Sequence, residues 1–311
     1  MLRHYEAAEV EAGLDYPRLV DALAAAFRRD GEPMPVRQAY DVGAAGNTGH
    51  LLTMPAWNRG EALGVKLVTV FPRNAERGLG AVSSIYVLFD GETGQPKALL
   101  DGEALTNRRT AAASALASRH LSRPDSRTLL LVGTGQVAAH LPAAHRTVRP
   151  IERILVWGRT REKAAALAAT LARDGFETAP VGDIAAALRE ADIVSCATTS
   201  VAPLIHGRDV APGTHVDLVG SFRPDMRESD DETIRLARVF VDTYPGTLAE
   251  AGDLLQPIKA GAWQSDRIQG DLHELETGAR PGRLGADEIT LFKSVGAAIE
   301  DLTAANLLVG G

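Results

Sequence analysis

The feature that most constrains the fold is a short apolar run that ends at a pair of glycines. Residues 129–132 are Leu-Leu-Leu-Val, and Gly133, Gly135 and Ala138 follow in the spacing G-x-G-x-x-A. This spacing is typical of the strand, turn and helix that begin a dinucleotide-binding fold. Gly133 allows a sharp turn, Gly135 lets a pyrophosphate approach the backbone, and Ala138 lets the helix pack closely on the strand.

The residues after this motif support the same interpretation. Residues 153–157 form a second apolar run, and a helical pattern follows over residues 162–173. Together they complete a βαβ unit of the expected length. A plain α/β unit without a nucleotide remains the alternative, because apolar strands often end in glycine.

The end of the second predicted strand bears on the choice of cofactor. In this fold that position normally carries an acid for the ribose hydroxyls, but residues 158–161 are Gly-Arg-Thr-Arg. The planar guanidinium of Arg159 matches the oxygens of a 2′-phosphate. We therefore expect NADP (NADPH) in preference to NAD, with a solvated surface arginine as the alternative.

The size and charge of the chain exclude several classes of protein. With 311 residues the chain is long enough for two domains, and its net charge of −7 is unlike the basic footprint of a nucleic-acid-binding protein. Its N-terminus lacks a signal-peptide core, and no run of apolar residues is long enough to span a membrane, so we expect a cytoplasmic protein.

Cysteine and histidine usage argues against metal chemistry. The single cysteine, Cys196, excludes an internal disulfide, and its apolar surroundings indicate a buried structural thiol instead of a nucleophile. The histidines show no metal-binding spacing; His140 and His145, for example, would not share a helix face. We expect no metal.

The N-terminal part of the chain predicts a mixed α and β domain. A helix is expected over residues 16–29, followed by strands at 50–54, 64–70 and 81–89 in a β-meander. Residues 101–119 then predict an alanine-rich helix that begins near Thr106.

From residue 128 onward, strands and helices alternate, which predicts a doubly wound parallel sheet. The expected strands are 128–132, 153–157, 176–180, 192–197, 215–219 and 239–242, and the helices between them include 161–174, 183–190 and 231–238. A loop at 282–285 is expected to end the sheet, and a long helix over 288–308 to follow it. The fold class is thus α/β, a Rossmann-type sheet with a smaller α+β domain.

Three cations in the first third of the chain are candidates for binding an anion. Lys66 lies inside an apolar strand. The alternative to an anion-binding role is that its side chain simply points to water. Arg109 precedes a small-residue helix that we expect to be buried, and Arg37 lies just before a loop. If the three converge, they would bind a substrate carboxylate.

Several motifs together resemble the ornithine cyclodeaminase/μ-crystallin family, from about residue 35 to residue 308 and in the family's order. Besides the glycine motif, they are Lys-Leu-Val-Thr at 66–69, Asp-Gly at 101–102 with Arg-Thr-Ala-Ala at 109–112, Trp-Gly-Arg-Thr at 157–160, the segment 220–228, and Phe-Lys-Ser-Val-Gly at 292–296 with Glu-Asp at 300–301.

The resemblance implies a homodimer of two-domain subunits that bind NAD(P) and a small amino or imino acid. Residues 1–112 and 287–311 would form the substrate-binding and dimerisation domain, and residues 113–286 the Rossmann domain. Arg37, Lys66 and Arg109 would hold the substrate carboxylate, with Lys66 also catalytic. The cofactor would contact Thr110, Gly133, Gly135, Gln136, Val137, Arg159, Thr160, Thr198, Ser200, Ser294, Val295 and Gly296.

Two departures from the family pattern bear on the reaction. The cyclodeaminases of this family place an acid where this chain has Phe222, and a glutamate where it has Leu52 and Thr53. A cyclodeaminase must move protons on two nitrogens, which these carboxylates would serve. The segment around Phe222 is similar instead to the ketimine reductases of the family.

The expected activity is therefore the NAD(P)H-dependent reduction of a cyclic 2-imino acid, Δ1-pyrroline-2-carboxylate or Δ1-piperideine-2-carboxylate, to proline or pipecolate. Ornithine cyclodeaminase and an amino-acid dehydrogenase of the alanine dehydrogenase type are the enzymatic alternatives. A non-enzymatic, μ-crystallin-like NADP-binding protein is the third possibility.

Overall fold

The computed structural model describes residues 2–30, 34–44 and 47–310. The chain divides into two compact units, one formed by Met1–Arg109 with Ala297–Gly311 and the other by Thr110–Gly296. The helix α3 (Gly102–Leu121) contains the first of these boundaries. Within the described residues, no helix is long and apolar enough to cross a membrane.

The first unit contains a mixed sheet, in which six strands of the described chain lie in the order β1-β6-β5-β4-β3-β2. All neighbours are antiparallel except β1, which pairs parallel to β6. The strands are β1 (Arg3–Tyr5), β2 (Gln38–Asp41), β3 (His50–Asn58), β4 (Ala62–Val70), β5 (Val82–Asp90) and β6 (Pro96–Asp101). The expected β-meander is confirmed in β3, β4 and β5.

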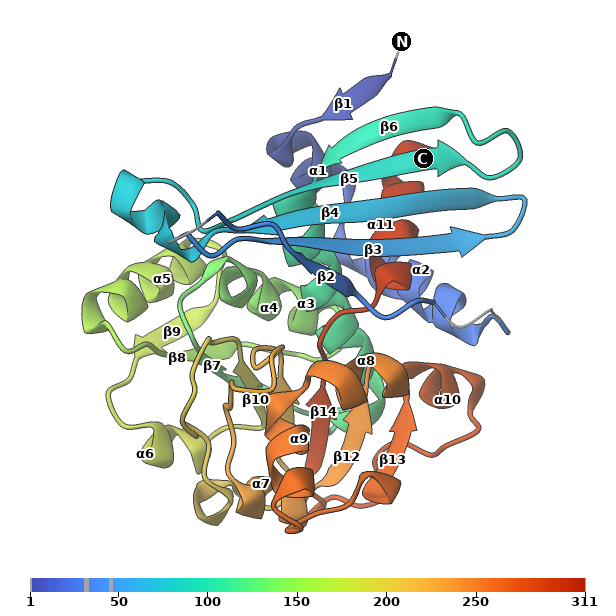
Figure 1. The fold of residues 1–311 in the computed structure, drawn as a ribbon. Helices are drawn as coiled ribbons and strands as arrows, with labels where there is room; N and C mark the ends of the chain where they lie inside the picture. Colours follow the sequence, from blue (N-terminus) through green and yellow to red (C-terminus); the bar gives the residue numbers. More distant parts are fainter. Residues whose placement is uncertain (1, 31–33, 45–46, 311) are drawn as a thin grey trace. The chain divides into compact units, whose positions relative to one another are not determined.

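Helices pack against this sheet and against one another. The helix α11 (Ala298–Gly310) contacts β3, β4 and β5 and also packs on α2 (Tyr16–Arg28) (Figure 1). Asp15 caps α2 by accepting a hydrogen bond from the backbone of Arg18, and α1 (Ala7–Gly13) precedes it. The chain therefore returns to its first unit at its C-terminal end, which brings residues near position 300 beside the central strands.

The second unit contains a sheet in which eight strands of the described chain are all parallel, in the order β13-β12-β14-β11-β10-β7-β8-β9. The strands are β7 (Thr128–Val132), β8 (Arg153–Trp157), β9 (Glu177–Pro180), β10 (Ile193–Cys196), β11 (His215–Leu218), β12 (Arg238–Val241), β13 (Ile268–Asp271) and β14 (Thr290–Lys293). From β9 to β14 the order is the 3-2-1-4-5-6 order of a Rossmann sheet, with its switch point between β7 and β10.

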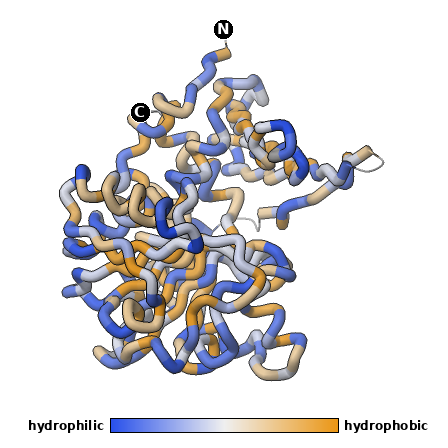
Figure 2. The backbone as a smooth tube through the Cα atoms, turned by 90° about the vertical axis from the view of Figure 1, so that its left-hand side faces the viewer, coloured by the Kyte–Doolittle hydropathy of each residue, from blue (hydrophilic) through white to orange (hydrophobic). Residues whose placement is uncertain are grey.

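The helices of the second unit connect these strands. They are α4 (Gln136–Arg146), α5 (Arg161–Arg173), α6 (Ile184–Leu188), α7 (Asp231–Leu236), α8 (Tyr244–Glu250), α9 (Gly252–Lys259) and α10 (Leu272–Thr277). The residues of β7, β10 and β11 are almost completely buried, and β7 is correspondingly an apolar run after Thr128. The buried polar residues of the other two strands are hydrogen-bonded: Ser195 donates to Asp217, and His215 pairs with Thr290. Figure 2 shows hydrophobic segments running through the interior of this unit and hydrophilic segments at its periphery.

The structure corrects the prediction for the end of the chain. Residues 288–297 are not helical; they contain β14, which lies between β11 and β12, and the last helix begins only at Ala298. The loop at 282–285 therefore does not end the sheet. The four residues of β14 are all buried, and a short buried strand cannot be told from a buried helix by its periodicity. The helix expected from near Thr106 begins one turn earlier, at Gly102.

Candidate active site

Lys66 is buried at the centre of the first unit and bonds to an acid from the other end of the chain. Only 3% of its surface is exposed. Its Nζ lies 3.0 Å from Oδ1 and 2.9 Å from Oδ2 of Asp301, and it donates a 3.3 Å hydrogen bond to Oγ1 of Thr106. The alternative of a solvated strand lysine is therefore wrong.

Arg109 joins the same group of charges. Its Nε donates a 3.0 Å hydrogen bond to Oδ1 of Asp301, and its Nη1 donates a 2.6 Å bond to Oε2 of Glu300. Its side chain and both carboxylates are almost completely buried. We call Lys66, Arg109, Glu300 and Asp301 the first charge cluster.

Local structure explains how these side chains meet. Along β4, Ala62, Gly64 and Lys66 alternate onto the buried face of the sheet. Thr106 and Arg109 are three residues apart on α3 and so share a helix face. The acids lie in the first turn of α11, where negative charge is favoured by the helix dipole.

The surroundings of Lys66 lower its pKa to about 8. Burial is the largest cause, and the positive charge of Arg109 adds to it, whereas Asp301 raises the pKa. Arg37, which is half-buried, lies close enough to Lys66 to lower its pKa further. Lys66 and Arg109 are thus brought together on Asp301, with Arg37 near enough to act on the charge of Lys66.

The glycine turn of the second unit has the geometry that a dinucleotide needs. Gly133 has a φ of +124°, and a Cβ there would lie 2.5 Å from the carbonyl oxygen of Ala197, at the end of β10. Gly135 is the N-cap of α4, and a Cβ at this position would meet nothing within 4 Å. Gln136 is exposed and Val137 half-buried in the first turn of α4, which has no acidic residue. The space and the free helix N-terminus therefore fit a pyrophosphate.

The predicted contacts at the end of β8 are accessible. Arg159 and the N-cap residue of α5, Thr160, are both exposed. Thr110 is half-buried on α3. The positions of these three residues are compatible with the expected roles, which stay predictions.

The predicted contacts after β14 have partners within the protein. The backbone N–H groups of Val295 and Gly296 each donate a 2.7 Å hydrogen bond to Oδ2 of Asp242. The backbone N–H of Ser294 bonds to the carbonyl of Leu218 at 3.2 Å. These three N–H groups hold the strand end in place, so the expected cofactor contact of Ser294, Val295 and Gly296 would have to use other atoms.

A second buried cluster lies at the ends of β10, β11 and β14. Glu228 accepts bonds from the backbone N–H (2.6 Å) and hydroxyl (2.8 Å) of Thr198. Lys293 donates to the carbonyls of Leu218 and Gly220, and its Nζ lies 3.7 Å from Oδ2 of Asp253. We call Glu228, Asp253 and Lys293 the second charge cluster. The nearby Ser200 hydroxyl donates to the carbonyl of Ala202.

The second charge cluster changes the ionisation of its members. Burial raises the pKa of Glu228 to about 8, although Lys293 acts in the opposite direction. Burial also raises the pKa of the Cys196 thiol well above its usual range, in agreement with the expected structural role. A thiol in this state is a poor nucleophile.

The sequence by itself assigns no role to several of these residues. Glu300 and Asp301 stand out only as part of a motif, and no local pattern joins Glu228, Asp253 and Lys293 into a cluster. A signal was present for the first pair, since two adjacent acids precede an apolar helix and follow the Phe-Lys-Ser-Val-Gly motif. Their partners could not be identified, because Lys66 and Asp301 are 235 residues apart.

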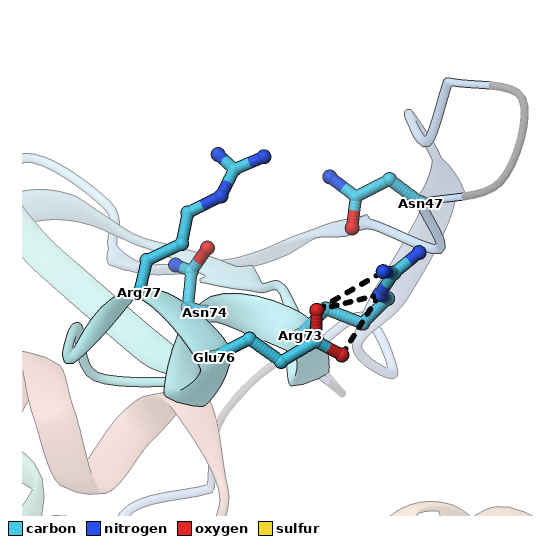
Figure 3. A pocket seen from close by; sticks show the side chains of 5 residues that line it. All are labelled: Asn47, Arg73, Asn74, Glu76 and Arg77. Carbon is cyan, nitrogen blue, oxygen red and sulfur yellow. Dashed lines mark hydrogen bonds and ion pairs between the residues drawn. The ribbon is translucent and has the colours of Figure 1, made fainter.

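A surface hollow in the first unit does not suit a substrate or cofactor. It has a volume of about 70 Å³ beside the 3₁₀ helix η1 (Pro72–Arg77), and polar residues line it: Asn47, Arg73, Asn74, Glu76 and Arg77 (Figure 3). Arg73 and Glu76 pair with each other at 3.0 Å. Ligand pockets usually measure roughly 300–1,000 Å³, so this hollow is far too small for a dinucleotide. Among the residues that the structure describes, no group of three His, Cys, Asp or Glu side chains could hold a metal ion.

The parallel sheet and the glycine turn at its switch point define a Rossmann-type, dinucleotide-binding class of protein. The chain belongs to the ornithine cyclodeaminase/mu-crystallin family, whose model matches residues 2–309.

Named relatives are similar over almost the whole chain. A Δ(1)-pyrroline-2-carboxylate reductase of Colwellia psychrerythraea is 42% identical over 310 residues, 97% of both chains. The structure of Thermococcus litoralis Δ(1)-pyrroline-2-carboxylate reductase in complex with NADH and L-proline superposes with a TM-score of 0.93 at 35% identity, covering 100% of this chain and 97% of the other. An archaeal alanine dehydrogenase dimer with bound NAD has a TM-score of 0.90 at 26% identity, covering 99% and 95%.

Proposed function

We propose that this protein is an NAD(P)H-dependent reductase of cyclic 2-imino acids, which converts Δ1-pyrroline-2-carboxylate or Δ1-piperideine-2-carboxylate to proline or pipecolate. The observation that carries the proposal is the buried group of cations in the first unit. Lys66 and Arg109 share the Asp301 carboxylate, and Arg37 lies close enough to lower the pKa of Lys66. An ammonium and guanidinium groups gathered in this way suit the carboxylate of a substrate.

The residues of the chain have distinct tasks in this reaction. Arg37, Lys66 and Arg109 bind the substrate carboxylate, and this positioning lowers the barrier by several kcal/mol. Lys66 supplies the proton for the ring nitrogen, which a lysine with a pKa of about 8 can do near neutral pH. The turn at Gly133 and Gly135 holds the pyrophosphate of the dinucleotide, which when bound supplies the hydride for C2 of the imine.

The test is a direct assay of reduction. Purified protein is mixed with each cyclic imine and with NADPH or NADH, and the loss of reduced nicotinamide is followed together with the formation of proline or pipecolate. We expect stoichiometric product. If neither imine is reduced with either cofactor, the proposal is wrong.

The same experiment separates the alternatives. Ammonia released from ornithine with catalytic NAD would identify a cyclodeaminase, and oxidation of alanine with NAD would identify a dehydrogenase. Tight nucleotide binding with no turnover would identify a binding protein. The cyclodeaminase is the weaker candidate because Phe222 and Leu52-Thr53 stand where that activity places acids.

We further propose that NADPH is preferred over NADH. Arg159 is exposed beside the start of α5, and residues 158–161 contain no acid that would repel a 2′-phosphate. In the R159A variant we expect the KM for NADPH to rise about tenfold and that for NADH to change little, since one charge-assisted contact contributes roughly 1.5–3 kcal/mol. A wild-type preference for NADH would refute this assignment.

We also propose that the protein is a homodimer joined through the sheet of the first unit. Apolar residues form a row across four strands on the face opposite Lys66: Pro55, Val65, Val87 and Leu99. Each remains partly exposed in the single chain. An extended apolar face of this kind is typical of an interface.

Sedimentation of the wild-type protein should give the mass of a dimer. V87D, in the middle of the row, should shift the equilibrium to monomer, whereas S83D, at the end of the same strand, should not. A monomeric wild-type protein would contradict the proposal. The cytoplasmic location expected from the sequence can be checked by fractionation of the source cells.

A further inference from the structure

Asp301 connects the two cations that the proposed function requires. Its side chain is completely buried. Oδ1 accepts a hydrogen bond from Lys66 and another from Arg109, both of 3.0 Å, and Oδ2 lies 2.9 Å from the ammonium of Lys66. The carboxylate thus fixes the direction of both side chains from a third element, α11.

We propose that Asp301 is a positioning residue that keeps Lys66 protonated and oriented for proton donation to the substrate nitrogen. This inference rests on the proposed reductase function and adds a residue to it. Asp301 does not itself transfer a proton to the substrate.

The charges around Lys66 explain why an acid is needed. Arg109 from α3 and Arg37 from the segment before β2 both favour the neutral amine, as does burial. Tyr86, directly opposite Lys66 on β5, is uncharged, because burial and Asp301 raise its pKa well above the usual value. Thr106 offers only a hydroxyl. Asp301 is therefore the acid that counters burial and both arginines.

The reaction balances with one proton from Lys66. A hydride from the reduced nicotinamide adds to C2, and the π electron pair of the C=N bond moves to nitrogen. The Nζ–H bond of Lys66 breaks while the new N–H bond of the product forms. The neutral Lys66 amine then takes a proton from water, and Asp301 favours this return of charge.

Glu300 provides a matched comparison for Asp301. It is the adjacent residue on α11 and equally buried, and it bonds to Arg109 at 2.6 Å. It is not among the largest influences on the pKa of Lys66. D301N removes a charge from both Lys66 and Arg109, and E300Q removes one from Arg109, so comparing the two isosteric substitutions isolates the effect on Lys66.

The first measurement is the pH dependence of kcat/KM. The wild-type rate should fall as the pH rises through about 8, where Lys66 loses its proton. In D301N this fall should occur at lower pH by about one unit, because an opposite charge is removed. Above about pH 8, kcat/KM of D301N should therefore be up to about tenfold lower than that of the wild-type protein. E300Q should change the KM for the imino acid but not the pH at which kcat/KM falls. D301E should return that pH to its wild-type value.

The second measurement reports Lys66 without turnover. The sequence contains five lysines, so the side-chain nitrogen resonances of ¹⁵N-lysine-labelled protein can be assigned with a K66M variant. We expect Lys66 to titrate at lower pH in D301N. R109Q, which removes a neighbouring positive charge, should move the titration to higher pH and serves if D301N does not fold.

The outcomes distinguish the two proposals. If D301N, or R109Q in its place, leaves the Lys66 titration unchanged, the role of Asp301 is refuted whether or not imines are reduced. If the titration moves as expected but the wild-type protein reduces no imine, the proposed function fails, and proton donation to substrate fails with it. If the Lys66 titration and the pH at which kcat/KM falls both move to lower pH in D301N, the reductase function and the role of Asp301 are both supported.

Discussion

Each of the two units buries a cluster of charged side chains, and the two clusters differ in their cations. In the first charge cluster Lys66 and Arg109 pair with Asp301 and Glu300, and Arg37 lies close enough to lower the pKa of Lys66. In the second, Lys293 lies beside Asp253, and Glu228 has a pKa raised to about 8, so it is mostly protonated near neutral pH. The several cations of the first cluster therefore suit an anionic substrate, whereas the second cluster offers one lysine that Asp253 already balances.

The two lysines also differ in the groups that accept their hydrogen bonds. Lys293 donates to the carbonyls of Leu218 and Gly220, at the end of β11, so it satisfies backbone groups where a strand ends. Lys66 donates instead to two side chains, those of Asp301 and Thr106. The comparison teaches that a buried lysine on backbone carbonyls supports the fold, whereas one held by a carboxylate among neighbouring arginines is available for chemistry.

The largest effect is expected for Lys66. The K66M variant should lose about 10²- to 10⁴-fold in kcat/KM for the imino acid, because it removes a proton donor and a contact to the carboxylate. Asp301 keeps Arg109 as a partner in this variant, so the fold should persist. Steady-state kinetics and a thermal melt measure the two effects.

The control for K66M is Lys97, an exposed lysine on β6 of the same sheet. K97M should keep wild-type kinetics. A K66M variant with nearly wild-type kcat/KM would remove the distinction between the two clusters.

The next effect concerns stability. K293M leaves the buried Asp253 without its cation and the carbonyls of Leu218 and Gly220 without their donor, so the free energy of unfolding should fall by about 3 kcal/mol. Denaturant titration measures this loss, and K259M, at an exposed lysine of α9, is the control. A stable K293M variant with impaired catalysis would reverse the comparison.

The smallest effect is a change in how stability depends on pH. Folding raises the pKa of Glu228 from an ordinary 4.5 to about 8, so its stabilising effect is complete at acidic pH and is lost as the pH rises through 8. E228Q cannot ionise. It should therefore gain stability relative to the wild-type protein between pH 5 and about pH 9, on the order of 2 kcal/mol. Thermal melts of E228Q and the wild-type protein across this pH range test the sign of the change in stability. A stability difference that is the same at every pH would show that Glu228 does not titrate in this range.

Much of the second unit follows from local sequence. The ranges of β7 and β8 were predicted to the residue, because each is an apolar run that ends at a residue with turn chemistry. The turn at Gly133 was predicted for the same reason, and its φ of +124° is one that glycine adopts readily. Burial of Cys196 followed from its apolar neighbours.

The sequence by itself therefore determined the glycine turn, the alternating strands around it, and the residue types that the chemistry needs. Tertiary structure decided that β14 completes the Rossmann order, and that Asp301 meets Lys66 across 235 residues. The physical reason is that periodicity and turn chemistry act between near neighbours, whereas pairings between distant residues depend on the path of the whole chain. The function of a buried charge lies in its partners, and folding selects them.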